Sequence, residues 1–331
     1  MAVKDYLRER FFPHMWCPGC GHGTILNSLI RAIEEMGLNK NEIVMTSGIG
    51  CSARISGYVD FHSLHTLHGR ALAFATGVKL SRPHLKVIVP MGDGDALAIG
   101  GNHFIHAARR NLDITVICVN NFNYGMTGGQ AGPTTPHGAK AVTTQYGNFE
   151  HPFNLPYLAA AGGASFVARW TVLHARRLGW TLREAMMHPG FSFVEIIAPC
   201  STSYARWNPE GRGMDPQKLG RRGLEVMMHY RQVGRIARHI HPKDAAVKVN
   251  EKGEIHEIIE GVFLDEPKPE FQAAIEHKAQ IAKDQWRKTK NRSSTTKRPS
   301  KPWMRSSTSA CGPACTSAAS GTAPTPPTAS T

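Results

Sequence analysis

Acidic and amide side chains follow two strand-like segments, close to the point where each segment ends. Asp93 comes shortly after the apolar run 86–91, and Asn121 follows the apolar run 114–119. Because ligands collect at the carboxyl ends of the strands of an open parallel sheet, we expect these side chains to lie close together. A carboxylate, an amide oxygen and a nearby carbonyl are the hard ligands that Mg²⁺ prefers. The glycines beside Asp93 would let the backbone approach phosphates, so the pattern favours a diphosphate held through Mg²⁺.

Cysteines form a second candidate site. Four of the seven could meet at a metal centre: Cys17, Cys20, Cys51 and Cys200. Four thiolates suit either zinc or a 4Fe–4S cluster, since both take near-tetrahedral sulfur ligation. Structural zinc sites usually contain two close pairs of ligands, and only one close pair is present here, which favours the cluster. The other cysteines are expected to be one core residue and two free surface thiols: Cys118, Cys311 and Cys315.

The elements that must position these residues alternate between strands and helices. Strands are predicted over residues 42–46, 86–91, 114–119, 165–168, 192–197 and 257–264. Helices are predicted over residues 24–35, 69–80, 99–110, 158–161, 171–179, 181–188, 223–239 and 270–288. Buried strands joined by helices indicate an α/β fold, a mostly parallel sheet with helices on both faces. The Gly-, Thr- and Pro-rich segment 122–146 is predicted to be a long loop, and loops of this length in compact domains are usually functional or disordered.

The formal net charge of +14 resides largely at the C-terminal end. Residues 287–331 contain eight Lys or Arg and no acidic residue, which leaves +6 for residues 1–286. A zinc-stabilised nucleic-acid-binding protein would leave the Asp93–Asn121 unit unexplained, so we expect no nucleic-acid partner. No apolar run could span a bilayer, and the first twenty residues carry charges where a signal peptide needs an apolar core. We therefore expect a cytoplasmic protein without membrane contact.

The Gly-Asp-Gly motif and the Asn pair that follows it are similar to the fingerprint of thiamine-diphosphate enzymes. A lone Gly-Asp-Gly is usually an ordinary turn, but an Asn pair after a second buried strand argues against that interpretation. The resemblance implies three Mg²⁺ ligands: the Asp93 carboxylate, the Asn121 side chain and the Asn123 carbonyl. It also implies cofactor contacts at Gly94, Asp95, Gly125 and Met126.

Five motifs in order resemble the β subunit of 2-oxoacid:ferredoxin oxidoreductases, over about residues 12–202: CPGCGHG, SGIGCSAR, HTLHGRALAFATGVKL, MGDGDALAIGGNHFIHAARRN and NNFNYGMTGGQAGPTTP. The resemblance implies a 4Fe–4S cluster on Cys17, Cys20, Cys51 and Cys200. It implies further contacts to thiamine diphosphate from Ile49, Gly50, Cys51, Ser52 and His68. The implied fold is the thiamine-diphosphate-binding α/β fold.

The activity that this resemblance implies is oxidative decarboxylation of a 2-oxoacid with coenzyme A, or the reverse carboxylation, with electrons passing through the cluster to ferredoxin. The run NNFNYGMTGGQ looks most like that of 2-oxoglutarate enzymes, which would form succinyl-CoA and CO₂. Pyruvate or another 2-oxoacid is the alternative substrate, and a non-redox thiamine-dependent decarboxylase or synthase is the alternative activity. The four-cysteine set argues against a non-redox enzyme.

The chain lacks one expected part of a thiamine enzyme, a glutamate in a recognisable motif that could activate the aminopyrimidine ring of the cofactor. The family resemblance implies that an α subunit supplies it, within an (αβ)₂ assembly. We accordingly expect three parts of the chain. Residues 1–205 would bind the cofactor and the cluster, residues 206–289 would pack on the same domain or on the partner subunit, and residues 290–331 would form a disordered basic tail.

Overall fold

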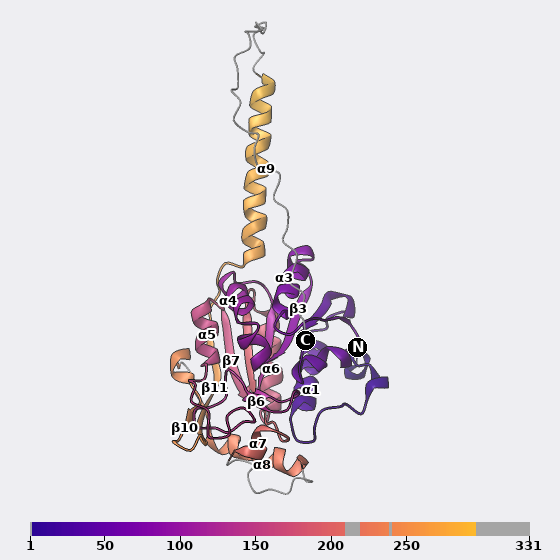
Figure 1. Cartoon of the computed structure of the whole chain (residues 1–331). Coiled ribbons are helices and arrows are strands. Elements are labelled where there is room, and N and C mark those ends of the chain that lie inside the picture. Colours follow the sequence, from indigo (N-terminus) through magenta and orange to yellow (C-terminus); the bar gives the residue numbers. More distant parts are fainter. Residues whose placement is uncertain (1, 209–218, 238–239, 296–331) are drawn as a thin grey trace, which may run out of the picture. The chain divides into compact units, whose positions relative to one another are not determined.

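A mostly parallel sheet runs through the first of the two units into which the chain divides, Met1–Ile281 and Ala282–Thr331. The computed structural model describes residues 2–208, 219–237 and 240–295. Strand order is β10-β11-β7-β8-β4-β3-β1-β2, and β9 also pairs with β11 (Figure 1). The bounds of these strands are β1 Ile43–Ser47, β2 His62–His65, β3 Lys86–Gly92, β4 Thr115–Asn120, β7 Phe166–Thr171, β8 Ser192–Ile197, β9 Gly234–Ile236, β10 Lys248–Val249 and β11 Ile255–Asp265. A separate hairpin joins β5, Asn123–Tyr124, to β6, Gln130–Ala131.

Neighbouring strands pair in parallel across the part of the sheet formed by β2, β1, β3, β4, β8 and β7. Strand β11 runs antiparallel to β7. Every residue of β1, β4, β7 and β8 is buried, as expected for strands covered on both faces. Side chains of β4 alternate between the two faces. Ile117 and Val119 enter one hydrophobic core, while Val116 and Cys118 enter the other. The prediction that Cys118 is a core residue is thereby confirmed.

Helices cover both faces of the sheet (Figure 1). The core on one face contains α1, His22–Glu35, and α6, Ala175–Met187. The core on the other face contains α3, Ala71–Ser81, α4, Gly101–Arg109, and α5, Leu155–Gly162. The remaining α-helices are α2 Ile55–Tyr58, α7 Tyr204–Trp207, α8 Leu219–Val233 and α9 Phe271–Thr295.

Short 3₁₀ helices lie between these elements, at Val3–Tyr6, Glu9–Phe11, Lys40–Glu42, Ser52–Arg54 and Pro242–Ala245. A π-helical turn, Gly94–Ala98, separates β3 from α4. Single π turns in α/β proteins often mark functional sites, because the widened turn re-aims its side chains. None of the described helices is both long and apolar enough to cross a membrane.

The predicted class, a mostly parallel α/β sheet with helices on both faces, is confirmed. Two helix predictions are wrong in detail. Residues 171–188 form the end of β7 and one helix rather than two helices, because Gly179 and Thr181 continue the α6 pattern. The predicted helix 223–239 ends at Val233, because residues 234–236 instead pair with β11 as strand β9.

The segment predicted to be a disordered tail starts inside a helix, because α9 continues to Thr295. The rest of that prediction, with Cys311 and Cys315, lies outside the described residues. The described part of residues 206–281 belongs to the same compact unit as residues 1–205.

Candidate functional site

The predicted cofactor residues meet in one cavity of about 100 Å³. The turns that follow β1, β3 and β4 form most of its wall, at the edge where parallel strands end. All twelve residues assigned to the cofactor or to Mg²⁺ line it: Ile49, Gly50, Cys51, Ser52, His68, Asp93, Gly94, Asp95, Asn121, Asn123, Gly125 and Met126. Gly92, Tyr124 and Thr127 complete the lining. Segments separated by up to 78 residues in the chain are thus brought together as the sequence motifs predict.

Asp93 is a buried carboxyl group at the start of the π-helical turn. The Thr134 hydroxyl donates a short hydrogen bond to Asp93 Oδ2. Burial raises the pKa of Asp93 to about 7, and the hydrogen bond from Thr134 offsets only part of that rise. A buried carboxylate is costly without a compensating charge, so this group suits a cation ligand. The Asn123 side-chain oxygen is also buried, without a hydrogen-bond partner in the described chain.

Asp95 joins three segments around the cavity. Its Oδ1 lies 2.5 Å from His68 Nδ1 and accepts a hydrogen bond of 2.7 Å from the Gly69 amide. The Ile49 amide donates a longer bond of 3.4 Å to the same oxygen. Burial raises the pKa of Asp95, and these hydrogen bonds oppose the rise. The contact fixes the orientation of the His68 ring and leaves Nε2 as the nitrogen that can serve a ligand in the cavity.

A buried polar network behind Asp93 was not predicted. Thr134 Oγ1 lies 3.0 Å from Asn120 Oδ1, and Asn120 Nδ2 donates to Glu195 Oε1 at 2.8 Å. Arg169 Nε in turn donates to Glu195 Oε2 at 2.7 Å. Glu195 and Arg169 are both fully buried and lie side by side on β8 and β7. The sequence signal that could have indicated this ion pair is a single charged residue within each of two buried, mostly apolar strands.

The four predicted cluster ligands line a second cavity, of about 230 Å³. Cys51, Asn121, Gly125 and Met126 line both cavities, so the two adjoin. Burial raises the pKa of Cys20 and of Cys51 to about 11, and the neighbouring cysteines add to the rise. Thiols crowded in this way favour a cationic centre that neutralises their thiolates. Among the described residues, no group of three or more His, Cys, Asp or Glu side chains is placed so that it could hold one metal ion.

His22 and Trp16 also line the cysteine cavity, and no role was predicted for either. The two rings are stacked with centroids 5.5 Å apart. Trp16 Nε1 donates to the Cys51 carbonyl at 2.8 Å, and His22 Nε2 lies 3.2 Å from Ser52 Oγ. Burial lowers the pKa of His22 to about 4, so the ring is neutral at pH 7. The pair therefore ties the Cys17–Cys20 loop to the cofactor cavity without adding charge.

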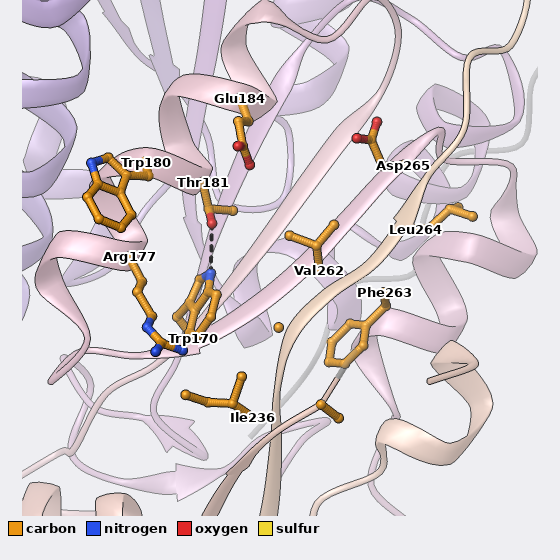
Figure 2. A pocket seen from close by; sticks show the side chains of 12 residues that line it. Trp170, Arg177, Trp180, Thr181, Glu184, Ile236, Val262, Phe263, Leu264 and Asp265 are labelled. Carbon is orange, nitrogen blue, oxygen red and sulfur yellow. Dashed lines mark hydrogen bonds between the residues drawn. The ribbon is translucent and has the colours of Figure 1, made fainter. Parts of the chain in front are cut away.

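A larger cavity, of about 680 Å³, lies elsewhere, between α6 and β11. Figure 2 shows its aromatic lining, in which Trp170 donates a hydrogen bond of 2.9 Å to Thr181. The Arg177 guanidinium lies 5.5 Å from the centre of the Trp170 ring. None of the predicted site residues lines this cavity. Cavity size alone would therefore select a different site from the one that the sequence motifs indicate.

Comparison with known proteins identifies the family of this chain. Residues 48–196 match the family model "Thiamine pyrophosphate enzyme, C-terminal TPP binding domain". The 2-oxoglutarate synthase subunit KorB of Methanocaldococcus jannaschii is 44% identical over 270 residues, which cover 82% of this chain and 94% of that protein. This chain belongs to the β subunits of the 2-oxoacid:ferredoxin oxidoreductases. The family that the five motifs indicated is thereby confirmed.

Two further relatives support the same family assignment for this β subunit. KorB of Archaeoglobus fulgidus is 57% identical over 198 residues, covering 60% of this chain and 74% of that protein. A solved structure, the 2-oxoglutarate:ferredoxin oxidoreductase of Magnetococcus marinus with 2-oxoglutarate, coenzyme A and succinyl-CoA bound, matches with a TM-score of 0.72 and 33% identity. The match covers 86% of this chain and 90% of the other. The β subunit therefore has the thiamine-diphosphate-binding fold of this family.

Proposed function

We propose that this chain is the thiamine-diphosphate-binding β subunit of a 2-oxoglutarate:ferredoxin oxidoreductase. The reaction would convert 2-oxoglutarate and coenzyme A to succinyl-CoA and CO₂, or run in reverse, with ferredoxin as the electron carrier. The observation that carries the proposal is the pair of adjoining cavities, one lined by the twelve cofactor residues and the other by four cysteines. Relatives named for 2-oxoglutarate favour this substrate over pyruvate.

The residues of the first cavity fit thiamine diphosphate with Mg²⁺. Asp93, Asn121 and Asn123 would hold the ion, since they offer one carboxylate and buried amide and carbonyl oxygens. When bound, the cofactor supplies the nucleophile and electron sink that decarboxylation of a 2-oxoacid requires. Asp95 orients the His68 ring, so that a proton can be held at Nε2 beside the cavity. Asp93, Asp95, Asn121 and Asn123 are buried, which shields their polar contacts from water.

The residues of the second cavity fit a 4Fe–4S cluster. Cys17, Cys20, Cys51 and Cys200 would each supply one thiolate. The shared wall at Cys51 would keep the cluster next to the cofactor, as the transfer of electrons between them requires. Zinc could bind four thiolates as well, but it has no redox chemistry.

A second subunit would complete the site. The only carboxylates among the described residues that line the cofactor cavity are Asp93 and Asp95, and no glutamate lies there. We expect an α subunit to supply the activating glutamate and part of the 2-oxoacid and coenzyme A sites, within an (αβ)₂ assembly in the cytoplasm.

The test is to produce this chain with its α subunit, purify the complex without oxygen and follow the reduction of methyl viologen. Coenzyme A is supplied throughout, and 2-oxoglutarate and pyruvate are compared. We expect the higher kcat/KM with 2-oxoglutarate. A higher value with pyruvate would overturn the substrate, and reduction with neither acid would overturn the activity.

A further inference from the structure

Helix α8 carries a stripe of basic and apolar residues on its exposed side. We call these four residues the α8 stripe: Arg221, Leu224, Met228 and Arg231. Their spacing of three, four and three residues places them on one face of the helix. Leu224 is 51% exposed and Met228 42% exposed, so the stripe presents two neighbouring apolar side chains on the surface.

A flank of α8, at Gly220 and Gly223, lies directly on the Cys17–Cys20 loop. A Cβ atom placed on Gly19 would meet the Gly220 carbonyl oxygen at 2.7 Å and the Gly223 Cα at 3.0 Å. The helix backbone therefore touches the loop backbone, with no side chain between them. Ser201, next to Cys200, donates a hydrogen bond of 3.2 Å to the Pro18 carbonyl, which fixes the loop further.

The surface around the α8 stripe is positively charged. The exposed side of residues 219–236 carries three arginines and one glutamate, a net charge of +2, because Arg222 is buried. Arg221 is paired with Glu225, and Arg235 with Glu257. Helix α7 packs beside α8 and adds Arg206, whose guanidinium lies 5.7 Å from the centre of the half-exposed Trp207 ring. The two helices are labelled next to each other in Figure 1. An apolar centre with arginines around it is suited to a partner with acidic groups around a small apolar patch.

The wall that the cysteine cavity shares with the cofactor cavity is formed by Cys51, Asn121, Gly125 and Met126. A protein bound to the α8 stripe would lie within about one helix diameter, roughly 10–12 Å, of the Cys17–Cys20 loop.

We propose that the α8 stripe is the docking surface for a small acidic one-electron carrier protein. The proposal rests on the proposed function. Oxidative decarboxylation releases two electrons for each 2-oxoacid, so two carriers must dock in succession. In each encounter one carrier is reduced by one electron and the complex is oxidised by one electron, and no covalent bond forms. A surface used in this way should bind weakly and through charge, so that each carrier leaves quickly.

The experiment compares variants of the complex with its α subunit. Leu224→Glu/Arg231→Glu replaces an apolar contact and a cation of the α8 stripe by acids. Ile105→Glu/Arg109→Glu makes the same pair of changes at exposed positions of α4 and serves as the matched control. Arg231→Glu alone is the second variant, since it removes no apolar contact. Calorimetry with an oxidised acidic ferredoxin gives its Kd, and two assays give the rates of ferredoxin reduction and of methyl viologen reduction.

In both stripe variants we expect the Kd and KM for ferredoxin to rise about tenfold or more, because complementary charges steer encounters of this kind. Viologen reduction and co-purification of the α subunit should be unchanged, and the α4 control should match the wild type. An unaltered Kd for ferredoxin in Arg231→Glu would overturn the proposal. Loss of the α subunit from Arg231→Glu would assign the stripe to the subunit interface and overturn it too. A wild-type complex that reduced neither viologen nor ferredoxin would instead refute the proposed function.

Discussion

Binding of Mg²⁺ and thiamine diphosphate should depend on pH through Asp93. Burial raises the pKa of this carboxyl group to about 7, and a metal ligand must lose its proton before it can bind the ion. Below that pKa, each pH unit should weaken cofactor binding about tenfold, which is about 1.4 kcal/mol. We therefore expect a nearly constant affinity between pH 8 and pH 7.5 and an affinity about tenfold lower at pH 6.

Calorimetry on the cofactor-free complex at a fixed Mg²⁺ concentration measures this dependence. Asp93→Asn is the control, because it keeps the shape of the side chain but cannot titrate. Any pH dependence of the affinity that remains in the variant arises from the phosphates of the cofactor and is subtracted. A wild-type affinity that stays constant from pH 8 to pH 6 after that subtraction would refute the assignment of Asp93 as an Mg²⁺ ligand.

The raised pKa of Asp93 also determines how the stability of the cofactor-free protein depends on pH. A carboxyl group whose pKa is higher in the folded state binds more protons there, so its stabilising effect is complete below the unfolded pKa of about 4. That effect is lost as the pH rises to about 7, the pKa of buried Asp93. Mg²⁺ with thiamine diphosphate relieves the buried charge, so the rise in Tm on adding them should be larger at pH 8 than at pH 6.

Three further predictions concern the cysteine cavity and the structure around it. Anaerobically purified protein should be brown with about four irons per chain, and Cys17→Ala should bleach it whereas Cys118→Ala should not; a colourless protein with stoichiometric zinc would exclude the redox mechanism. Arg169→Met leaves Glu195 buried without its cation and should cost about 3–5 kcal/mol of unfolding free energy in urea titration, and a loss below 1 kcal/mol would contradict the ion pair. Gly223→Ala places a methyl group against the Gly19 backbone and should lower the iron content after purification in air; an unchanged content would show that α8 is free to shift.

Much of the fold was predictable because its central strands are continuous apolar runs. Strand β2, His62–His65, was missed because it lies at the edge of the sheet and is largely exposed, so its polar residues give no buried pattern. Strand β9 was missed because only its pairing with β11 distinguishes it from the end of α8. Such pairings between distant segments leave no local signal.

The candidate site was predictable to the level of its cavity lining, since each residue belongs to a motif at a strand end. The contacts that hold these site residues in place were not predictable. The partnership of Glu195 with Arg169 depends on which strands are neighbours, and the cover that α8 gives to the Cys17–Cys20 loop depends on two glycines some 200 residues away. The large aromatic cavity beside Trp170 also arises from segments that no motif connects.

The Arg169 side chain sets a lower limit on the fragment that can fold alone. Its Nη1 donates to the carbonyls of Ala245 and Ile259, which belong to the segment after residue 205. A protein truncated at residue 205 would lose both carbonyl acceptors together with β11, which pairs with β7, and would leave β7 as an open edge of the sheet. The smallest autonomous unit therefore extends through β11, and proteolysis inside it should remove the cofactor site together with the C-terminal segment.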